Sequence, residues 1–302
     1  MHQKKGGIFI AKSRKQIIEE LEKNPDKIIP LITDSMIKKV LKKYKILIVY
    51  IMEAIGEEIK EEEINFIDSK NNPERNTSNR EKDIIFKNKN ELYGIEINNN
   101  SGGISIIKRN LTYVGDMLME YDYNVTQINI NNGRLPEDKE KLLGVLYYPE
   151  IKEAMTEVLK IYMLSIPKFR EMSYTNSKYR KEFIQFMKML TLDSRKEIEE
   201  VIKGSKLLKE VHEMQKKLSS RKFYINEYAE KRCMEDYAKE QLELGEAIGE
   251  QRGISIGRNE GISIGANNKT IELARNMLKE GATTSFVSKV TGLSKKALMT
   301  IL

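Results

Sequence analysis

The segment that most constrains the fold is KDIIFKNKNELYGIEIN, at Lys82–Asn98. Two runs rich in β-branched and aromatic residues, Lys82–Lys87 and Leu92–Ile97, flank a polar stretch at Asn88–Glu91. β-Branched and aromatic residues favour strands, whereas polar, Asn-containing stretches favour tight turns. The segment therefore predicts a β-hairpin, and with it a chain that contains a sheet.

A two-residue loop at Lys89–Asn90 would fix the register of this hairpin. Asn88 then faces Glu91, and counting back along both strands places Asp83 opposite Glu96. Directly opposed residues of an antiparallel pair have Cβ atoms about 4.5–5.5 Å apart. Two carboxylates held that close repel each other, and a divalent cation between them would remove the repulsion.

Strand alternation adds an amide to this pair of acids. Asn98 falls on the face of Glu96, while Ile95 and Ile97 fall on the other face. An Asp, a Glu and an amide on one rigid face suit a hard metal ion. The alternative is that the charged residues only solvate the polar face of a two-stranded ribbon, which is a common arrangement. A change of one residue in the turn would also break the pairing of the two acids.

Composition narrows the class of protein. The 302 residues are 40% hydrophobic and 32% charged, which is typical of a globular chain, and the net charge of +7 permits a nucleic-acid partner without requiring one. Cys233 is the single cysteine, so no intrachain disulfide is expected, and with only His2 and His212 beside it neither is a zinc cluster. The apolar runs Ile8–Ala11 and Ile46–Met52 are too short for a signal peptide and a membrane span. We therefore expect a cytoplasmic protein without a membrane segment.

Helices are expected before the hairpin. The spacing of apolar residues predicts a short helix at Lys15–Lys23 and a longer one from Thr33-Asp34-Ser35 to about Glu58. Asp34 stands where an N-cap residue belongs, and capping is one role for it. The alternative role is that of a third acidic residue directed at the hairpin site.

A helix with basic residues is expected after the hairpin, at Ile106–Tyr121. Lys108 and Arg109 lie about one turn before Tyr113 on this helix. Residues in this arrangement suit contact with a phosphate, and the alternative is a solvated helix face.

The rest of the chain reads as two strands followed by helices. Strands are expected at Val125–Ile130 and at Leu159–Ile166, the second of which is stopped by Pro167. From Tyr179 onward the apolar spacing is helical, with helices expected at Glu182–Leu190, Glu197–Leu218 and Lys222–Leu244.

A ladder of glycines follows, in which every fourth residue is glycine: Gly245, Gly249, Gly253, Gly257, Gly261 and Gly265. A glycine inside a helix costs about 0.8–1.0 kcal/mol relative to alanine, so six cost about 5 kcal/mol. Either a second helix packs against this stripe, which predicts self-association into a homo-oligomer, or the segment is a flexible linker. Charged residues such as Glu250 and Arg258 exclude a bilayer as its surroundings. The segment is not a phosphate-binding loop, because it has no GxxxxGK[ST] pattern.

The C-terminal tail has the pattern of a helix-turn-helix. An amphipathic helix at Thr270–Lys279 is capped by Gly281, and Thr284–Val290 and Ser294–Leu302 follow as shorter helices. The turn between these two contains a glycine at Thr291-Gly292-Leu293, as in helix-turn-helix motifs. Lys289, Lys295 and Lys296 would then be available to DNA phosphates, and the alternative is a small helical cap.

Several of these segments form one further pattern. They are Asp34-Ser35-Met36-Ile37-Lys38, the hairpin from Asp83 to Asn98, Lys108-Arg109 with Tyr113, the run IYMLSIPKF at Ile161–Phe169, the glycine ladder, Ile271–Leu278 and Val290-Thr291-Gly292-Leu293. Together they resemble the PD-(D/E)XK nuclease family transposases, also called the recombination-promoting nuclease family. The resemblance spans most of the chain, and its most specific parts are the C-terminal region and the IPKF segment.

The resemblance implies an α/β fold with a restriction-endonuclease-like core, a mixed sheet flanked by helices, followed by a helical C-terminal region. It implies a Mg²⁺-dependent endonuclease that hydrolyses DNA phosphodiester bonds in recombination or in mobile elements. Carried over residue by residue, Asp83 and Glu96 would be the metal ligands, and Asp34 would be an acidic residue from the first helix. The expected divisions of the chain are residues 1–170 for the nuclease-like core, 171–244 for a helical region, 245–268 for the ladder and 269–302 for the tail.

Asn98 departs from the family's pattern. It stands at the last position of the E-x-K motif, where lysine stabilises charge or orients the attacking water and where the family often has glutamine. An amide orients a water molecule but cannot take its proton, so activation would fall to the metal. The alternative function is therefore a catalytically degenerate DNA-binding or assembly protein of the same family.

Overall fold

The computed structural model describes residues 4–5, 8–67, 84–98, 111–112, 114–115, 117–118, 123–148, 153–154, 156, 158–175 and 177–301. The chain divides into two compact units, Ser13–Arg232 and a smaller unit made of Met1–Lys12 and Cys233–Leu302. Each unit is described by itself below.

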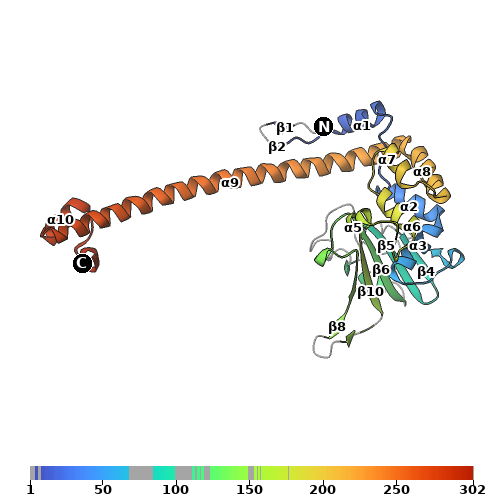
Figure 1. Ribbon diagram of the computed structural model, residues 1–302, viewed down its shortest axis with the longest axis horizontal. Coiled ribbons are helices and arrows are strands. Elements are labelled where there is room, and N and C mark those ends of the chain that lie inside the picture. The colour runs from blue at the N-terminus through green and yellow to red at the C-terminus, as the bar shows by residue number, and fades with distance from the viewer. Residues whose placement is uncertain are drawn as a thin grey trace, which may run out of the picture. The chain divides into compact units, whose positions relative to one another are not determined.

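The larger unit is built on a six-stranded mixed sheet (Figure 1). From one edge to the other the strands are β3 (Asn65–Phe66), β4 (Ile84–Asn88), β5 (Glu91–Asn98), β6 (Asn124–Asn131), β10 (Leu159–Ser165) and β7 (Lys141–Val145). β3 pairs antiparallel with β4, and β4 pairs antiparallel with β5. β5, β6 and β10 are parallel to one another, and β7 returns antiparallel to β10. The expected mixed sheet flanked by helices is confirmed. A separate two-stranded pair joins β8 (Tyr147–Tyr148) to β9 (Glu153–Ala154).

The hairpin of β4 and β5 has the predicted turn and register. Lys89 and Asn90 form the turn, and Asn88 pairs with Glu91. The pairing continues back to Ile84, which lies opposite Ile95. Lys89 takes the left-handed φ of 52°, a conformation that a tight two-residue loop demands.

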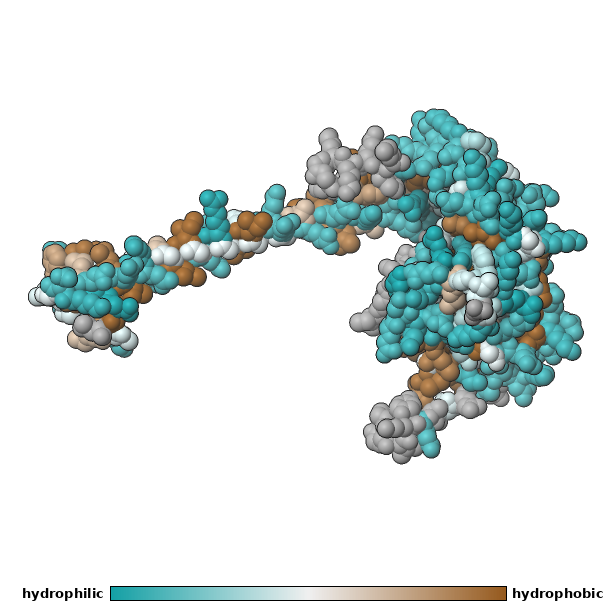
Figure 2. Space-filling view, viewed as in Figure 1, coloured by the Kyte–Doolittle hydropathy of each residue, from teal (hydrophilic) through white to brown (hydrophobic). Residues whose placement is uncertain are grey.

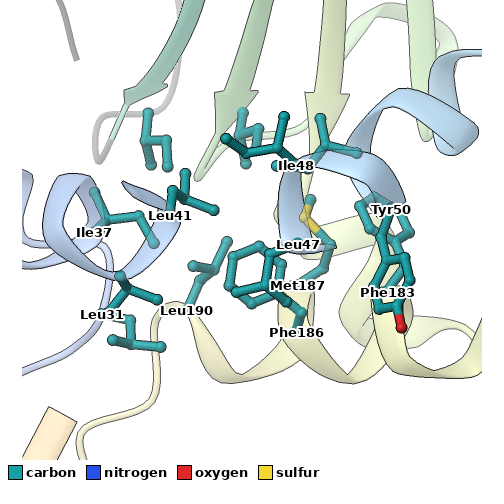
Figure 3. Packing of buried hydrophobic residues seen from close by; sticks show 14 of the residues in the cluster. Leu31, Ile37, Leu41, Leu47, Ile48, Tyr50, Phe183, Phe186, Met187 and Leu190 are labelled. Carbon is teal, nitrogen blue, oxygen red and sulfur yellow. The ribbon is translucent and has the colours of Figure 1, made fainter. Parts of the chain in front are cut away.

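Helices cover one face of the sheet and form the main core there. They are α2 (Asp34–Lys43), α3 (Lys45–Ile55), α5 (Ile166–Glu171), α6 (Lys181–Met189), α7 (Arg195–Val201) and α8 (Lys206–Ser219). Figure 3 shows how their side chains meet below the strand ends, with Leu41 of α2, Ile48 of α3 and Phe186 of α6 converging. The strands contribute alternate residues such as Tyr93 and Ile95 to the same cluster. Alternation in β5 therefore commits its odd-numbered residues to this core.

The opposite face carries a smaller apolar cluster at one end only. Its members are Ile85, Leu92, Val114, Met117, Val125 and Leu159. Leu92, Val125 and Leu159 lie side by side in register on three neighbouring strands. The described residues between 111 and 118 are helical, and Val114 and Met117 from that segment help to bury the cluster. The other end of this face is polar, and the candidate site lies there.

Two predicted long helices are each broken in the structure. The helix expected from Thr33 to Glu58 is split at Tyr44, which has φ −111° and ψ 72°, into α2 and α3. The helix expected over Glu197–Leu218 is split into α7 and α8, and Gly204 between them takes φ 90°, a conformation that glycine tolerates best. Apolar spacing alone did not reveal these breaks, because helices on both sides of each break face one core.

Smaller helices complete the larger unit. They are α1 (Arg14–Lys23), which has a capping box formed by Ser13 and Gln16, and the single turns η1 (Glu61–Glu63) and η2 (Pro136–Asp138). The predicted N-cap of α2 was wrong by one residue. Thr33 occupies the cap position, and Asp34 is the first helical residue, where its charge still favours the positive helix N-terminus.

The smaller unit contains most of α9 (Lys222–Lys279), a single continuous helix whose first residues, through Arg232, belong to the larger unit. All six glycines of the ladder lie within this helix. A methyl group added at any of the six would meet nothing within 4 Å in the structure. A two-stranded pair, β1 (Lys4–Lys5) and β2 (Ile8–Phe9), belongs to the same unit, and the Phe9 amide donates to the carboxylate of Glu243 at 2.7 Å.

The short helices predicted for the tail are present as α10 (Thr284–Thr291) and α11 (Lys295–Ile301). Together with the end of α9 these helices bury a small core of Ala274, Val287 and Leu298. Gly281 and Gly292 take left-handed φ values of 88° and 74° where the chain turns. Among the residues that the structure describes, none of the helices has the length and apolar content to cross a membrane.

Candidate active site

A row of polar side chains lies on the face of the sheet opposite the main core. Strand register brings together Glu96 and Asn98 of β5, Gln127, Asn129 and Asn131 of β6, and Ser165 of β10. Each of them is buried, and Glu96 is the most exposed at 6%. The row continues the line that begins with the apolar Leu92, so one face changes from apolar to polar toward the carboxyl ends of the parallel strands. Ligand sites of sheets with parallel strands are found at such ends.

Hydrogen bonds join these amides into a chain. The Asn129 Nδ2 donates to the Tyr162 carbonyl at 3.3 Å, and the Asn131 Nδ2 donates to the Asn129 carbonyl at 3.2 Å. The Asn98 Nδ2 donates to the Asn131 Oδ1 at 3.0 Å. The Ser165 hydroxyl donates to the Gly133 carbonyl at 2.9 Å, which ties β10 to the loop after β6.

One acceptor of this chain is left without a partner. Asn98 is only 3% exposed, and its Oδ1 is buried. This oxygen makes no hydrogen bond to any residue that the structure describes. A buried polar atom left unsatisfied costs about 1–3 kcal/mol. Buried polar atoms without partners are rare in folded proteins, so each one calls for an explanation. A ligand that contacts the Asn98 oxygen would remove the cost of burying it.

Gly94 makes room for the amide row. A Cβ at this position would clash with the Gln127 Oε1, and it would lie 3.1 Å from the Met117 Cε, which is tighter than most real Cβ contacts. The Gln127 side chain therefore lies directly over the backbone of β5, and the absence of a side chain at Gly94 permits this. The glycine in the predicted strand marks a close approach, which is a usual reason for glycine within a strand.

Four charged residues surround the carboxyl ends of β6 and β10. Arg134 forms ion pairs with Asp138 and Glu171, and the Lys168 Nζ lies 2.8 Å from the Asp138 Oδ2 and 3.4 Å from the Glu171 Oε2. The hydrogen bonds from Lys168 and Arg134 hold the pKa of Asp138 below its usual value. Arg134, Asp138 and Glu171 are about half exposed, whereas Lys168 is 24% exposed.

The predicted catalytic residues fall into three groups. Glu96 and Asn98 lie together on one face, as alternation predicted, while Ile95 and Ile97 lie in the main core. Asp83 lies outside the described residues. Asp34 is half exposed on α2, which packs on the opposite face of the sheet, and its Oδ1 accepts a hydrogen bond from the Lys231 Nζ at 2.9 Å.

The predicted DNA-contacting residues divide in a similar way. Lys108, Arg109 and Tyr113 lie outside the described residues. Lys295 and Lys296 are exposed in the first turn of α11.

The donor atoms at the site suit a hard cation. Carboxylate and amide oxygens are the protein ligands that Mg²⁺ and Ca²⁺ prefer, and Glu96 with Asn98 supplies one of each. No group of three His, Cys, Asp or Glu residues able to hold a metal lies within the described part of the chain. Glu96 and Asn98 could together hold a hard divalent cation, and Asp83, the predicted second carboxylate, lies outside the described residues.

Sequence analysis did not find the partners of Asn98. Gln127, Asn129 and Asn131 alternate with Ile128 and Ile130 along the predicted third strand. Amides at every second position of a strand would have indicated a polar face. The alternation does not show which strand lies beside this one in the sheet, because the order of strands depends on tertiary pairing.

Comparisons with family models, with curated proteins and with solved structures found no significant match to this chain. The resemblance to PD-(D/E)XK transposases stays a prediction from the residues themselves.

Proposed function

We propose that this chain is a Mg²⁺-dependent DNA endonuclease of the PD-(D/E)XK transposase type, with a restriction-endonuclease-like core and a role in recombination or mobile elements. The support is the order of elements: a helical region, an antiparallel hairpin, and then a strand parallel to the second strand of that hairpin. Acidic residues of such a core stand on the hairpin strands, as Asp83 and Glu96 do in the sequence.

The observation that carries the proposal is the placement of Glu96. A carboxylate with 6% exposure on a sheet face lies two residues before Asn98, whose buried amide oxygen has no hydrogen-bond partner among the described residues. A cation bound to this oxygen would offset the cost of burying it unpaired. In the sequence Asp83 directly precedes Ile84, the first described residue of β4, which pairs with Ile95. One more pair on that ladder would be Asp83 and Glu96.

In the proposed reaction Asp83 and Glu96 hold the ion, and Asn98 orients the attacking water. When bound, Mg²⁺ would lower the pKa of a coordinated water and stabilise charge on the phosphate. Asn98 cannot act as a base, because a neutral amide does not accept a proton at physiological pH. Arg134 and Lys168 stand at the same edge of the sheet, where both pair with Asp138 and Glu171, so a DNA phosphate would have to compete with these acids for them.

The proposal is tested with the purified full chain and supercoiled plasmid DNA. We expect nicked or linear product with Mg²⁺ and none with EDTA. Plasmid that stays supercoiled across Mg²⁺ and Mn²⁺ concentrations, in the presence of DNA binding, would favour the second function.

The second function is that of a catalytically degenerate DNA-binding or assembly protein. It is favoured by Asn98 in place of lysine and by the helix-turn-helix geometry of α10 and α11. The two functions separate in one experiment, because only an endonuclease turns over plasmid in a metal-dependent way.

The tail lysines are expected to contribute to DNA affinity without sequence preference. The double change Lys295→Gln/Lys296→Gln should weaken binding and reduce the slope of log affinity against log salt by up to about 2, since each phosphate contact adds about 0.9. A filter-binding titration over several salt concentrations measures both effects. Lys15→Gln/Lys23→Gln on α1 is the control with the same charge change at exposed positions. Equal slopes for the two variants would remove α11 from the DNA interface.

The glycine ladder of α9 is proposed to mediate self-association into a homo-oligomer. Figure 2 shows hydrophobic residues along the exposed helix, among which are Ile254, Ile256, Ile262 and Ile264. None of the six glycines packs against another part of the described chain. The helix therefore bears the cost of the glycines, about 5 kcal/mol, without a compensating contact from the residues that the structure describes.

Leucines in the ladder should disrupt this association. Gly253→Leu/Gly257→Leu places bulk on the stripe, and we expect the dissociation constant of the oligomer to rise at least about tenfold, equivalent to 1.4 kcal/mol. Sedimentation equilibrium of the full chain measures it. Ser255→Leu is the control, because residue 255 lies on the opposite side of the helix from both glycines. A wild-type chain that stays monomeric at all concentrations, or two variants that behave alike, would contradict the proposal.

A further inference from the structure

The orientation of the Asn98 amide follows from the hydrogen bonds around it. A backbone carbonyl only accepts, so the bond to the Asn129 carbonyl must come from the NH₂ of Asn131. The oxygen of Asn131 is then the atom that faces Asn98, and it too only accepts. Asn98 must therefore turn its NH₂ toward Asn131, at 3.0 Å. Its oxygen is left on the other side of the amide, without a hydrogen-bond partner in the described part of the chain.

This arrangement reverses the chemistry of the residue that the PD-(D/E)XK pattern has at this position. Lysine presents three hydrogen-bond donors and a positive charge, whereas Asn98 presents an acceptor oxygen that has no hydrogen-bond partner among the described residues. The donor side of the amide is already used by Asn131. The free side therefore suits a cation or a hydrogen-bond donor, and it is poorly suited to an anionic phosphate oxygen.

Glu96 lies close enough to Asn98 for both side chains to bind one metal ion. Residues two apart on one strand project from the same face, about 6.5–7 Å apart along the strand. Oxygen atoms on side chains of this length reach a single ion, since Mg²⁺ binds oxygen at about 2.0–2.1 Å. Glu96 contributes negative charge, and Asn98 contributes a neutral oxygen. Both side chains are more than nine-tenths buried, so water competes with them less than at an exposed site.

We infer that Asn98 is a direct ligand of the divalent cation through its Oδ1, and that Asn131 is the positioning residue that turns this oxygen toward the ion. The inference deepens the proposed function and rests on it for the identity of the ion. It replaces the water-orienting role of Asn98 with metal ligation. The cation would then bind to Glu96 and Asn98, with its remaining positions open to water or a phosphate oxygen.

The test is metal binding by the DNA-free full chain, measured with Mn²⁺ by isothermal titration calorimetry and by electron paramagnetic resonance of free Mn²⁺. We expect Asn98→Leu, which is close in size but has no oxygen, to weaken Mn²⁺ binding about tenfold or more. Asn98→Lys brings a positive charge to the ion and should abolish measurable binding. Asn98→Asp supplies a charged oxygen and should bind at least as tightly as the wild type.

The role of Asn131 has its own pair of variants. Asn131→Leu frees the Asn98 amide to rotate and should weaken Mn²⁺ binding about tenfold. Asn131→Asp keeps an acceptor for the Asn98 NH₂ and should retain binding. Asn124→Leu, the same change at the opposite end of β6, is the control and should leave affinity unchanged. Thermal unfolding of each variant without metal shows whether it is folded.

The outcomes separate this inference from the proposed function. Mn²⁺ affinity that is equal in wild type and in folded Asn98→Leu would overturn the inference, whether or not the protein cuts DNA. Mn²⁺ binding that depends on Asn98, in a protein that does not cut, would uphold the inference and reject the nuclease. No Mn²⁺ binding by the wild type would overturn the inference, and metal-dependent cutting would then have to come from another site.

Discussion

Replacing Asp83 and Glu96 together by alanine should abolish Mg²⁺-dependent nicking of plasmid DNA. Glu96 is buried on the polar face of β5, and Asp83 is its predicted neighbour across the hairpin. Loss of groups that stabilise charge in a transition state lowers rates about 10²–10³-fold for a single contact. We expect at least that loss from the double variant, measured as the initial rate of supercoiled plasmid conversion with Mg²⁺ in excess.

The control for this experiment must match its charge change. Asp83→Ala/Glu96→Ala makes the chain two units more positive, which by itself would tighten DNA binding. Glu61→Ala/Glu62→Ala makes the same change at exposed residues of η1 and should leave the rate near that of the wild type. Nicking that persists in the double variant at the rate of this control would show that Asp83 and Glu96 do not form the hydrolytic site.

A further expectation concerns the charge of Glu96 alone. Glu96→Gln keeps the size of the side chain and removes its charge, so the sheet should stay intact while the metal loses a ligand. Loss of activity with unchanged thermal unfolding would assign the effect to chemistry and not to folding.

Replacing Phe169 by alanine should cause the largest loss of stability that we predict for a single core residue. Phe169 follows the end of β10 in α5, and it is fully buried. Its ring lies 5.0 Å from that of Tyr179 and 5.1 Å from that of Phe183, both in edge-to-face geometry. Truncating a buried phenylalanine costs about 3–5 kcal/mol of unfolding free energy.

Urea unfolding followed by circular dichroism measures this effect. Phe223→Ala is the matched control, because Phe223 is 65% exposed in the same unit and its loss should cost less than about 1 kcal/mol. Similar costs for the two variants would show that the aromatic cluster does not hold α5 in place. The cluster gives a physical reason for the IPKF segment: Ile166 and Phe169 are buried, Pro167 stands in the first turn of the helix, and Lys168 pairs with Asp138.

The hairpin shows how far local chemistry carries a prediction. Turn residues and strand alternation are short-range properties, so Asn88–Glu91 pairing and the shared face of Glu96 and Asn98 followed from a few neighbouring residues. The helical tail followed in the same way from apolar spacing and from Gly281 and Gly292 at the turns. Helix breaks at Tyr44 and Gly204 did not, because both sides of each break keep an apolar face toward the core.

The glycine ladder was resolved only by the structure. Its sequence is compatible with a helix that packs through its glycines and with a flexible chain. Which of the two forms depends on whether packing contacts offset the low helix propensity of glycine, and the sequence does not show those contacts. The structure has one continuous helix with open space around every glycine of the ladder. The self-association that would offset its cost is an intermolecular property, which the sedimentation experiment addresses.

The sequence by itself determined the hairpin, its register and the two residues, Glu96 and Asn98, that share its polar face. Only the tertiary structure decided that β6 lies beside β5 in parallel, so that Asn131 accepts a hydrogen bond from the Asn98 amide. The physical reason is the range of the interactions involved. Alternation and turns act between near neighbours in the chain, whereas the order of strands depends on burying both faces of the whole sheet at once.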